Sequence, residues 1–424
     1  MTVSERAALV GLLSRKMQAS DPEHALDELA GLAEAAGARV VLRLLQERPK
    51  PDPATFLGSG KVDTLAAACS DARVDVVIFD NELSPAQLRN LEARLGVKVV
   101  DRTQLILDIF ARRARTREGK LQVELAQLRY LMPRLVGAGT ALSRLGGGIG
   151  TRGPGETKLE TDRRRIRYRI ASVTRDIDEV RRRRGQLRER RHKAALPTVA
   201  LIGYTNAGKT TLFNALTGEA ARASNALFVT LDPLVRRVRL PDQRQLLVSD
   251  TVGFIDRLPH SIVAAFRATL EEAADADLLL HVIDASAPDR EHHIETVRSV
   301  LLDIGAARVP SLDVLNKADL LDEAERGRLR ALHPAGFCIS ALYGEGRGDL
   351  LDTIASRLAL DTTAVSLTFD LQNGQREVVA ELYRHGRVLR HLTTGTRVSI
   401  DAELPRRLLP RFEQYRVREG GPRR

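Results

Sequence analysis

The sequence predicts a multidomain α/β protein, and three observations support this fold class. Strand and helix patterns alternate over the first 115 residues, two rows of apolar residues at heptad spacing follow, and a glycine-containing loop later separates a buried strand from a helix. A chain of 424 residues is also too long for one hydrophobic core. We expect an N-terminal parallel α/β domain (1–115), an antiparallel helical hairpin (116–195), a P-loop domain (196–360) and a small α+β C-terminal domain (361–424).

The composition indicates a globular protein of a reducing compartment. Apolar residues make up 43% of the chain, and no apolar run reaches the roughly 20 residues that cross a bilayer. Cys69 and Cys338 stand far apart and match no metal-binding or disulfide pattern. The first residues lack the basic and then apolar order of a signal peptide. We therefore expect a cytoplasmic protein without a membrane span, and a monomer.

Four strands and three helices are predicted in the N-terminal domain. The expected strands are Ala7–Leu12, Arg39–Leu45, Val74–Phe79 and Val97–Val100, and helical patterns cover residues 22–37, 59–72 and 84–96. Ser84 and Pro85 make a favourable helix start, with serine as N-cap and proline at the first helical position. Since strands that alternate with helices pair in parallel, a parallel sheet covered by helices is expected.

The next segment predicts a helical hairpin. Apolar side chains recur at steps of four and three along Leu121–Leu135 and Ile166–Val180. Such heptad rows bury against each other in a helix pair. Pro133 should kink or end the first helix near its tip. The alternative is that both rows bury against a neighbouring domain, because two or three heptads are short for an independent coiled coil.

The link between these helices is rich in glycine and leads into a basic helix. Six of the ten residues from Gly146 to Gly155 are glycine, and the formal G-x-G-x-x-G inside this run follows a helix rather than a strand, which argues against a dinucleotide site. Between Thr151 and Lys193, 16 Lys and Arg face 7 Asp and Glu, so this stretch carries +9 (16 − 7) of the chain's +11. RNA is the favoured partner and a solvated face the alternative. The candidate RNA-binding residues are Arg152, Lys158, Arg163, Arg164, Arg165, Arg167 and Arg169.

A phosphate-binding loop opens the next domain. Residues 203–210 match G-x-x-x-x-G-K-[ST] between the apolar stretch Val199–Ile202 and a helical pattern. Glycines let successive N–H groups converge on phosphate oxygens, Lys209 reaches the β and γ phosphates, and Thr210 offers its hydroxyl to Mg²⁺. A tight turn that only requires glycine is the alternative. The loop residues expected at the nucleotide are Gly203, Tyr204, Thr205, Asn206, Ala207, Gly208, Lys209, Thr210 and Thr211.

Strand and helix signals continue to the end of the chain. The expected strands of the P-loop domain are Val235–Leu240, Gln245–Val248, Asp277–Ile283, Ser311–Leu315 and Gly336–Ile339, with helices near 261–275, 289–305 and 320–332. A short turn joins the first two strands, which predicts one antiparallel pair. In the C-terminal domain we expect a strand at Val365–Leu371, a helix at Gly374–Tyr383, and one or two strands within Val388–Ile400.

Two motifs at strand ends predict the metal site and the base. In Asp250-Thr251-Val252-Gly253 the carboxylate can hold the Mg²⁺ shell through water, and the Gly253 N–H can contact a γ-phosphate. In Asn316-Lys317-Ala318-Asp319 the Asp319 carboxylate can accept both N1–H and N2–H of guanine, which adenine does not offer. Ser340-Ala341-Leu342 would close over the base. The order of these motifs predicts a P-loop GTPase (G) domain that binds GTP.

The catalytic set is read from the same region. Thr230, in Phe228-Val229-Thr230, could supply the second Mg²⁺ hydroxyl, so the candidates are Lys209, Thr230, Gly253 and Asn206. Phe254 stands where a glutamine orients water in many small GTPases, so we expect slow unaided hydrolysis and an external activator. Asn206 could ligate a monovalent cation, with K⁺ the candidate.

Long strings of the chain resemble the HflX family of ribosome-associated GTPases. They include 78-IFDNELSPAQLRNLE-92, 146-GGGIGTRGPGETKLETDRR-164 and 250-DTVGFIDRLPH-260, and the resemblance covers about residues 5–400. It implies the same four-part architecture, with the hairpin loop (here Gly146–Thr157) reaching toward the peptidyl transferase centre. Two positions depart from the family: Leu234 replaces a frequent threonine, which leaves Thr230 as the Mg²⁺ ligand, and Asp313 interrupts the strand before Asn316.

The resemblance also implies a function. A family member binds the large (50S) ribosomal subunit and its 23S rRNA, and it splits stalled or hibernating ribosomes under stress such as heat or antibiotics. We therefore predict a GTPase that converts GTP to GDP and phosphate, with Mg²⁺, and that the ribosome stimulates. Two alternatives remain open: an ATP-using rRNA remodeller, and an RNA-binding hibernation factor whose GTPase acts as a timer.

Overall fold

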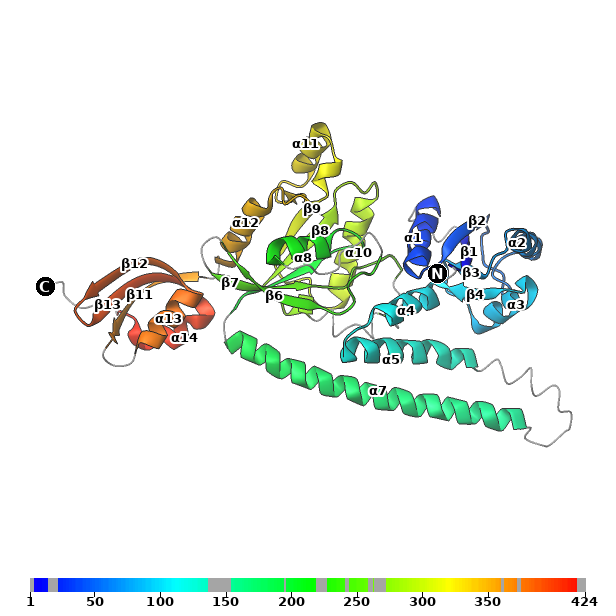
Figure 1. The fold of residues 1–424 in the computed structure, drawn as a ribbon, viewed down its shortest axis with the longest axis horizontal. Coiled ribbons are helices and arrows are strands. Elements are labelled where there is room, and N and C mark those ends of the chain that lie inside the picture. Colours follow the sequence, from blue (N-terminus) through cyan, green and yellow to red (C-terminus); the bar gives the residue numbers. More distant parts are fainter. Residues whose placement is uncertain are drawn as a thin grey trace. The chain divides into compact units, whose positions relative to one another are not determined.

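The structure, a computed structural model, describes most of the chain as two compact units (Figure 1). The described residues are 4–13, 22–135, 154–193, 196–218, 227–240, 244–257, 262, 272–359, 362–371 and 375–417. Unit 1 comprises Met1–Arg181, Ser224–Asp232 and Asp256–Ala268, and unit 2 the rest. Two segments of the P-loop domain sequence therefore group with the N-terminal unit. The four domain boundaries stay predictions.

Unit 1 is built on a parallel sheet with the strand order β2-β1-β3-β4. Its strands are β1 (Arg6–Leu13), β2 (Arg39–Glu47), β3 (Val76–Phe79) and β4 (Lys98–Asp101), which confirms the four predicted strands. Helices α2 (Ser59–Asp71) and α3 (Pro85–Leu95) bury apolar side chains against one face of the sheet. Helices α1 (Pro22–Ala35) and α4 (Arg102–Arg113) also pack on the sheet and contact each other.

The helix starts follow their caps. Ser84 Oγ accepts a hydrogen bond from Gln87 N and the Gln87 side chain accepts one from Ser84 N, which confirms the predicted N-cap of α3. Helix α4 was not predicted. Asp101 is both the last residue of β4 and the N-cap of α4, so the strand runs into the helix without a turn signal in between.

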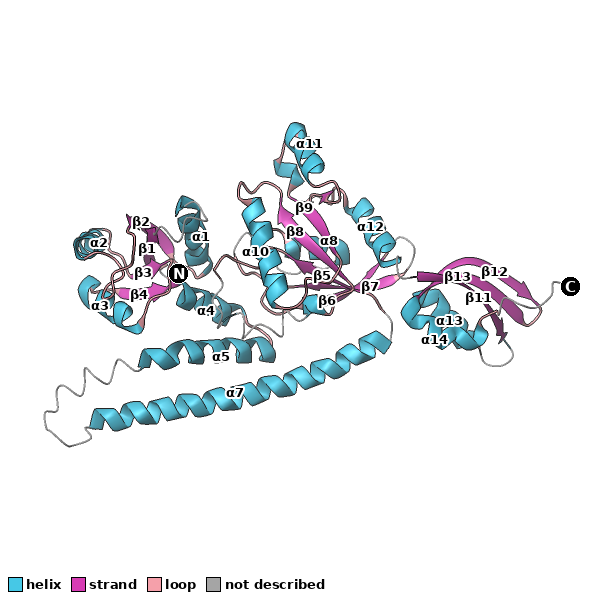
Figure 2. Cartoon of the chain, turned by 180° about the vertical axis from the view of Figure 1, so that it is seen from behind, coloured by secondary structure: helices cyan, strands magenta, loops and turns pink. Residues whose placement is uncertain are grey.

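The hairpin consists of α5 (Arg117–Arg134) and α7 (Pro154–Lys193) (Figure 2). Leu121 and Leu125 of α5 bury against Val173 and Ile177 of α7, which confirms the centre of the predicted seam. Helix α5 ends one residue after Pro133, as predicted. Helix α5 also contacts α4. The glycine-rich link lies outside the described residues.

Unit 2 carries a six-stranded sheet in the order β10-β9-β8-β5-β7-β6. The strands are β5 (Thr198–Ile202), β6 (Leu234–Arg239), β7 (Gln245–Asp250), β8 (Leu278–Asp284), β9 (Ser311–Asn316) and β10 (Phe337–Cys338). All pair in parallel except β6, which is antiparallel to β7, so the predicted strands and the antiparallel pair are confirmed. The predicted helix at 261–275 falls largely outside the described residues.

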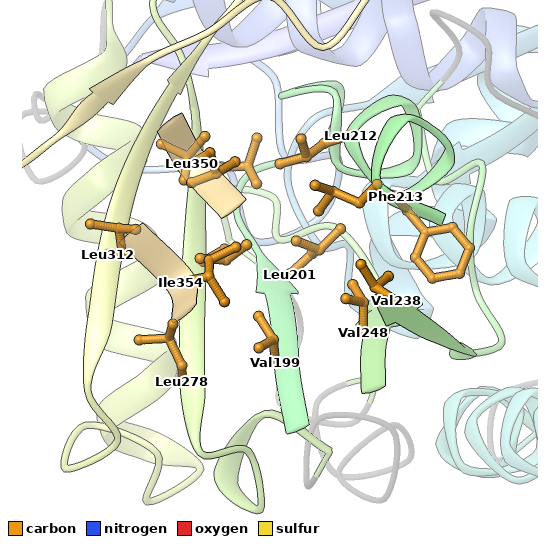
Figure 3. Close-up of a cluster of buried hydrophobic side chains, with 14 of the residues drawn as sticks. Val199, Leu201, Leu212, Phe213, Val238, Val248, Leu278, Leu312, Leu350 and Ile354 are labelled. Carbon is orange, nitrogen blue, oxygen red and sulfur yellow. The ribbon is translucent and has the colours of Figure 1, made fainter. Parts of the chain in front are cut away.

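Helices cover both faces of this sheet. Leu212 and Phe213 of α8 (Lys209–Thr217) and Leu350 of α12 (Arg347–Ala359) bury against Leu201 and its neighbours in one cluster (Figure 3). Helices α10 (Arg290–Asp303) and α11 (Glu323–Leu332) contribute to a second cluster with the ends of β8 and β9. Both clusters pack against the central strands, and the predicted motifs lie at the carboxyl ends of these strands.

The C-terminal part of unit 2 has its own core. Strands β11 (Thr362–Asp370), β12 (Arg387–Thr394) and β13 (Arg397–Pro405) form an antiparallel sheet in the order β11-β13-β12. Helices α13 (Arg376–His385) and α14 (Leu409–Phe412) lie on one face of it (Figure 1). Two strands, β12 and β13, run through the stretch Val388–Ile400, where one or two were expected, and the described members of the buried cluster all belong to this part.

Candidate nucleotide-binding site

The phosphate loop follows the buried strand β5, and its glycines are required by their surroundings. Gly203 and Gly208 have φ angles of +149° and +90°, which side chains rarely adopt. A side chain at Gly203 would collide with the Val282 carbonyl, and one at Gly208 with the Asn316 amide. Gly208 is also the N-cap of α8 and places no side chain over its first turn. The helix start therefore offers its N–H groups to an anion.

Lys209 is folded into the loop that carries it. Its Nζ donates to the carbonyls of Gly203 (3.0 Å) and Tyr204 (2.7 Å), and only 6% of the residue is exposed. Burial lowers the pKa of Lys209 to about 8, and the nearby Asp250 partly opposes this shift. A Cβ at Gly253 would meet the ammonium at 3.0 Å. The structure thus brings Lys209 and Gly253 together, as a γ-phosphate contact requires.

The groups predicted to hold the metal lie beside the loop. Thr210 Oγ1 donates to Asp250 Oδ2 at 2.8 Å, and Asp250 is fully buried at the end of β7. A hydroxyl and a carboxylate are hard oxygen donors of the kind that Mg²⁺ prefers. A cation bound by the Thr210 oxygen would leave its O–H free to donate to Asp250. The donor set therefore fits the predicted Mg²⁺ site.

Asn316 connects the phosphate loop with the base-binding segments. Its Nδ2 donates to the Ala207 carbonyl at 2.8 Å and its Oδ1 accepts from Ala341 N at 2.9 Å. The residue is 2% exposed at the end of β9. Asp319 follows in a short 3-10 helix, Ala318–Leu320, where it is half-buried. One amide thus fixes the spacing between the loop for the phosphates and the segments predicted to hold guanine.

Phe254, the residue directly after the Asp250–Gly253 motif, is paired with the phosphate loop. Thr205 N donates to the Phe254 carbonyl at 2.7 Å, and Phe254 N donates to the Gly203 carbonyl at 3.1 Å. The Phe254 side chain is 1% exposed, so it is part of the core and no water-orienting group stands at this position. Asn206, in contrast, is exposed with φ +59°. Its role toward a cation stays a prediction.

The residues predicted for the second metal hydroxyl belong to unit 1. Phe228 packs edge to face on Phe110 of α4, with ring centroids 4.7 Å apart. Asp232 accepts hydrogen bonds from the backbone N–H groups of Arg115 and Thr116, both at 2.9 Å, and from the Thr116 hydroxyl. Val229 and Thr230 lie between these anchors. Since Thr210 belongs to unit 2, a Mg²⁺ ion shared by Thr210 and Thr230 stays a prediction.

The segment after Phe254 also holds to unit 1. Arg257 pairs with Asp80 at 2.9 Å. The buried Arg102 binds the other Asp80 oxygen at 2.7 Å and donates to the Asp256 carbonyl at 3.0 Å. Arg102 also pairs with Glu28. This cluster of charged residues around Arg102 could not be predicted from a sequence motif, because its members come from four separate parts of the chain.

Two further contacts of the site region were missed in the sequence. Asp284, at the end of β8, accepts from Lys317 Nζ at 2.6 Å. Its position at the carboxyl end of a parallel strand is a signal that could have found it. Asp313, which interrupts β9, lies opposite His281 on β8 and accepts from its Nδ1 at 3.2 Å. This hydrogen bond is the main cause of the lowered pKa of Asp313. The interruption thus pairs a half-buried aspartate with the buried His281.

The basic residues of α7 divide into two groups. Arg169 forms a bidentate pair with Glu124 of α5, at 2.5 and 2.9 Å, and so joins the two helices of the hairpin. Arg164, Arg165 and Arg167 are exposed and Arg163 is half-buried. Arg152 lies outside the described residues, and the Lys158 side chain is not described. The exposed arginines are therefore the better candidates for RNA contact.

Comparisons with known proteins agree with this site. Three family models match consecutive parts of the chain: "GTP-binding GTPase N-terminal" over residues 23–111, "GTP-binding GTPase Middle Region" over 113–191 and "50S ribosome-binding GTPase" over 198–317. None of the described helices combines the length and the apolar composition that a membrane crossing needs.

Relatives match over nearly the whole chain. GTPase HflX of Caldanaerobacter subterraneus subsp. tengcongensis is 46% identical over 97% of this chain and 94% of that protein. GTPase HflX of Escherichia coli is 47% identical over 82% of this chain and 83% of that protein. Among solved structures, a GTP-binding protein from Sulfolobus solfataricus in complex with GDP is 26% identical, with a TM-score of 0.45 over 83% of this chain and 98% of that chain.

Proposed function

We propose that this chain, which belongs to the HflX family of GTPases, binds the large ribosomal subunit and dissociates stalled or hibernating ribosomes. The observation that carries the ribosomal part is the basic helix α7, whose exposed Arg164, Arg165 and Arg167 can contact 23S rRNA. The family model over residues 198–317 is described as a 50S ribosome-binding GTPase. The protein acts in the cytoplasm, as a monomer, under stress that stalls translation.

Each group of the site has a part in the proposed hydrolysis. The loop from Gly203 to Thr211 wraps the phosphates, and Lys209 moves from its two carbonyl partners onto the β and γ oxygens. Asp319 selects guanine, and Asn316 keeps its loop in place. Thr210 and Thr230 would hold Mg²⁺, which neutralises phosphate charge when bound. Because the Phe254 side chain is buried and cannot orient water, the bound ribosome accelerates GTP hydrolysis.

Co-sedimentation with purified 50S subunits tests the ribosomal part. Wild type should sediment with the subunits in the presence of a non-hydrolysable GTP analogue, and deletion of Gly146–Gly155 should weaken this binding. A sucrose gradient of 70S ribosomes then separates splitting from hibernation. If the ribosomes stay intact and only gain the protein, splitting is wrong and the hibernation-factor alternative holds.

Two arms test the catalytic assignments. Single-turnover GTP hydrolysis should be faster in K⁺ than in Na⁺ for the wild type and equally slow in both salts for Asn206→Ala. Equal wild-type rates would exclude the cation role. Competition experiments should show that GTP and not ATP displaces bound GDP, and Asp319→Asn should shift preference toward xanthine nucleotides. Displacement by ATP would favour the remodeller alternative.

A further inference from the structure

Tyr168 stands on the side of α7 that faces away from the hairpin seam. It lies two residues from both Ile166 and Ile170, which is about 200° around a helix in either direction. Ile170 packs against the buried seam, and Arg169 is held by Glu124 of α5. Tyr168 itself is 74% exposed. A large aromatic side chain therefore points to solvent from a helix whose position is fixed on its other side.

Arginines surround this tyrosine on its own face. Arg164 and Arg165 lie one turn before it and Arg175 lies two turns after it, and all three are exposed. Small residues, Ala171 and Ser172, occupy the turn that follows. Helical side chains lean toward the N-terminus, so the ring lies over the turn that carries Arg164 and Arg165. Arg134 stacks on Tyr130, and no arginine whose side chain the structure describes stacks on the Tyr168 ring.

We propose that Tyr168 stacks on an unpaired base of RNA while Arg164 and Arg165 hold the adjoining phosphates. This rests on the proposed function, because the RNA is taken to be ribosomal. An exposed aromatic ring between cations is how proteins hold single-stranded RNA, since every base offers a π-face and its backbone offers negative charge. A duplex does not satisfy the site, because its bases are stacked on each other.

The charge around Tyr168 favours RNA over a protein partner. A protein interface on this face would have to neutralise three arginines within about three helical turns, whereas phosphates recur along an RNA strand at every nucleotide. Arg165 has an acidic neighbour in Asp162, yet at 3.8 Å and with a side chain 79% exposed this pair is loose. This face of α7 therefore keeps its positive charge. The Tyr168 ring adds a stacking contact with a base, which the charged groups do not make.

The test separates stacking from charge. The full chain is titrated, at several KCl concentrations, with a fluorescent single-stranded 12-mer RNA, with its blunt duplex and with 50S subunits. Tyr168→Ala should weaken binding of the single strand about 5- to 100-fold at every salt concentration, and Tyr168→Phe should restore it. Arg164→Ala should instead lower the slope of log K against log salt by about 0.7. Because Tyr168 is exposed, these variants keep the fold, and circular dichroism checks it.

Each outcome decides the matter. If Tyr168→Leu binds the single-stranded RNA as well as Tyr168→Phe does, an apolar side chain without an aromatic ring is sufficient, and the stacking proposal is wrong. If Tyr168→Ala binds single strand and 50S subunits like the wild type, the inference is overturned while the proposed function stands. If the wild type binds the single strand through Tyr168 but ignores 50S subunits, the proposed function fails and the stacking site remains.

Discussion

At the residue scale, Lys209 couples nucleotide binding to pH. Its ammonium is buried against two carbonyls, which lowers its pKa to about 8, whereas phosphates would raise it again. Above pH 8 the nucleotide-free protein loses this proton and binding must take it up. We expect the affinity for GDP to fall about tenfold between pH 7 and pH 9.

Calorimetry checks this directly. In buffers of different ionisation enthalpy at pH 9, the wild type should take up close to one proton per GDP bound. Lys209→Met, which has no proton to exchange, should bind weakly with little uptake. A wild-type affinity that is flat from pH 7 to pH 9 would contradict the assignment.

The His281–Asp313 pair predicts a pH-dependent contribution to stability. The His281 hydrogen bond lowers the pKa of Asp313 below its usual 3.8, so the pair stabilises the fold above that value and loses its contribution as pH falls through the lowered pKa. Asp313→Leu leaves the buried His281 without its acceptor and should cost about 1–3 kcal/mol at neutral pH.

Urea unfolding at pH 7 and pH 3 measures this difference. The wild type should lose more stability than Asp313→Leu on acidification, so that the gap between them narrows. Leu312→Ala, a buried apolar change in the same strand, is the matched control, since its cost should be similar at both pH values. A constant gap for Asp313→Leu would show that the pair does not titrate.

At the scale of elements, helix α5 is held at both ends by aspartates from elsewhere. Near its C-terminal end, Tyr130 and Arg134 both bind the buried Asp101, at 2.9 Å each. Burial and the neighbouring Asp101 raise the pKa of Tyr130, which therefore stays a hydrogen-bond donor. At its N-terminal end, Asp232 accepts from Arg115 and Thr116. The start of helix α5 is thus hydrogen-bonded to the segment that contains Thr230.

Removing that contact should loosen both partners. We expect Asp232→Ala to cost about 0.5–1.5 kcal/mol through the lost hydrogen bonds, and to speed hydrogen exchange in 227–232 and in the first turn of α5. Exchange measured by mass spectrometry on peptides from both regions checks this. Asp303→Ala, an exposed aspartate at the end of α10, should change neither region. Faster exchange in only one of the two would show that they are not coupled.

The elements and motifs were readable from the sequence, and the contacts that join them were not. Periodicity placed the strands of the parallel sheet of unit 1 and of the mixed sheet of unit 2, and loop glycines marked the phosphate site. Helix α4 was not predicted, because Asp101 is both the last residue of a strand and the N-cap of the helix. The hydrogen bonds to Asp232 were not predicted, because their donors lie 116 and 117 residues away along the chain and no local sequence pattern encodes such a contact.

At the scale of the whole molecule, the cores predict which part can be removed. Helix α12 contributes Leu350 and Ile354 to the core beneath the nucleotide site, whereas the described residues of the buried cluster in the C-terminal sheet all lie beyond residue 360. A chain truncated after Asp361 should therefore fold and bind GDP within about twofold of the full chain. Truncation after Gly346, which removes α12, should abolish binding.

Calorimetric titration of both truncated chains with GDP tests this division. Thermal unfolding with and without GDP gives the second readout. A ligand that binds only the folded state raises the unfolding midpoint temperature of the unit that binds it. Loss of GDP binding on removal of residues 362–424 alone would show that the C-terminal sheet supports the site.

Asn316 also bears on how such a protein can evolve. It uses both halves of one amide, the NH₂ on the Ala207 carbonyl and the oxygen on the Ala341 N–H. Aspartate lacks the donor and leucine lacks both groups, so either substitution leaves a buried backbone group unpaired. Asp319, in contrast, is predicted to contact the guanine base. Base preference can therefore change by one substitution at Asp319, whereas loss of the Asn316 amide disturbs the phosphate loop and the Ala341 segment together.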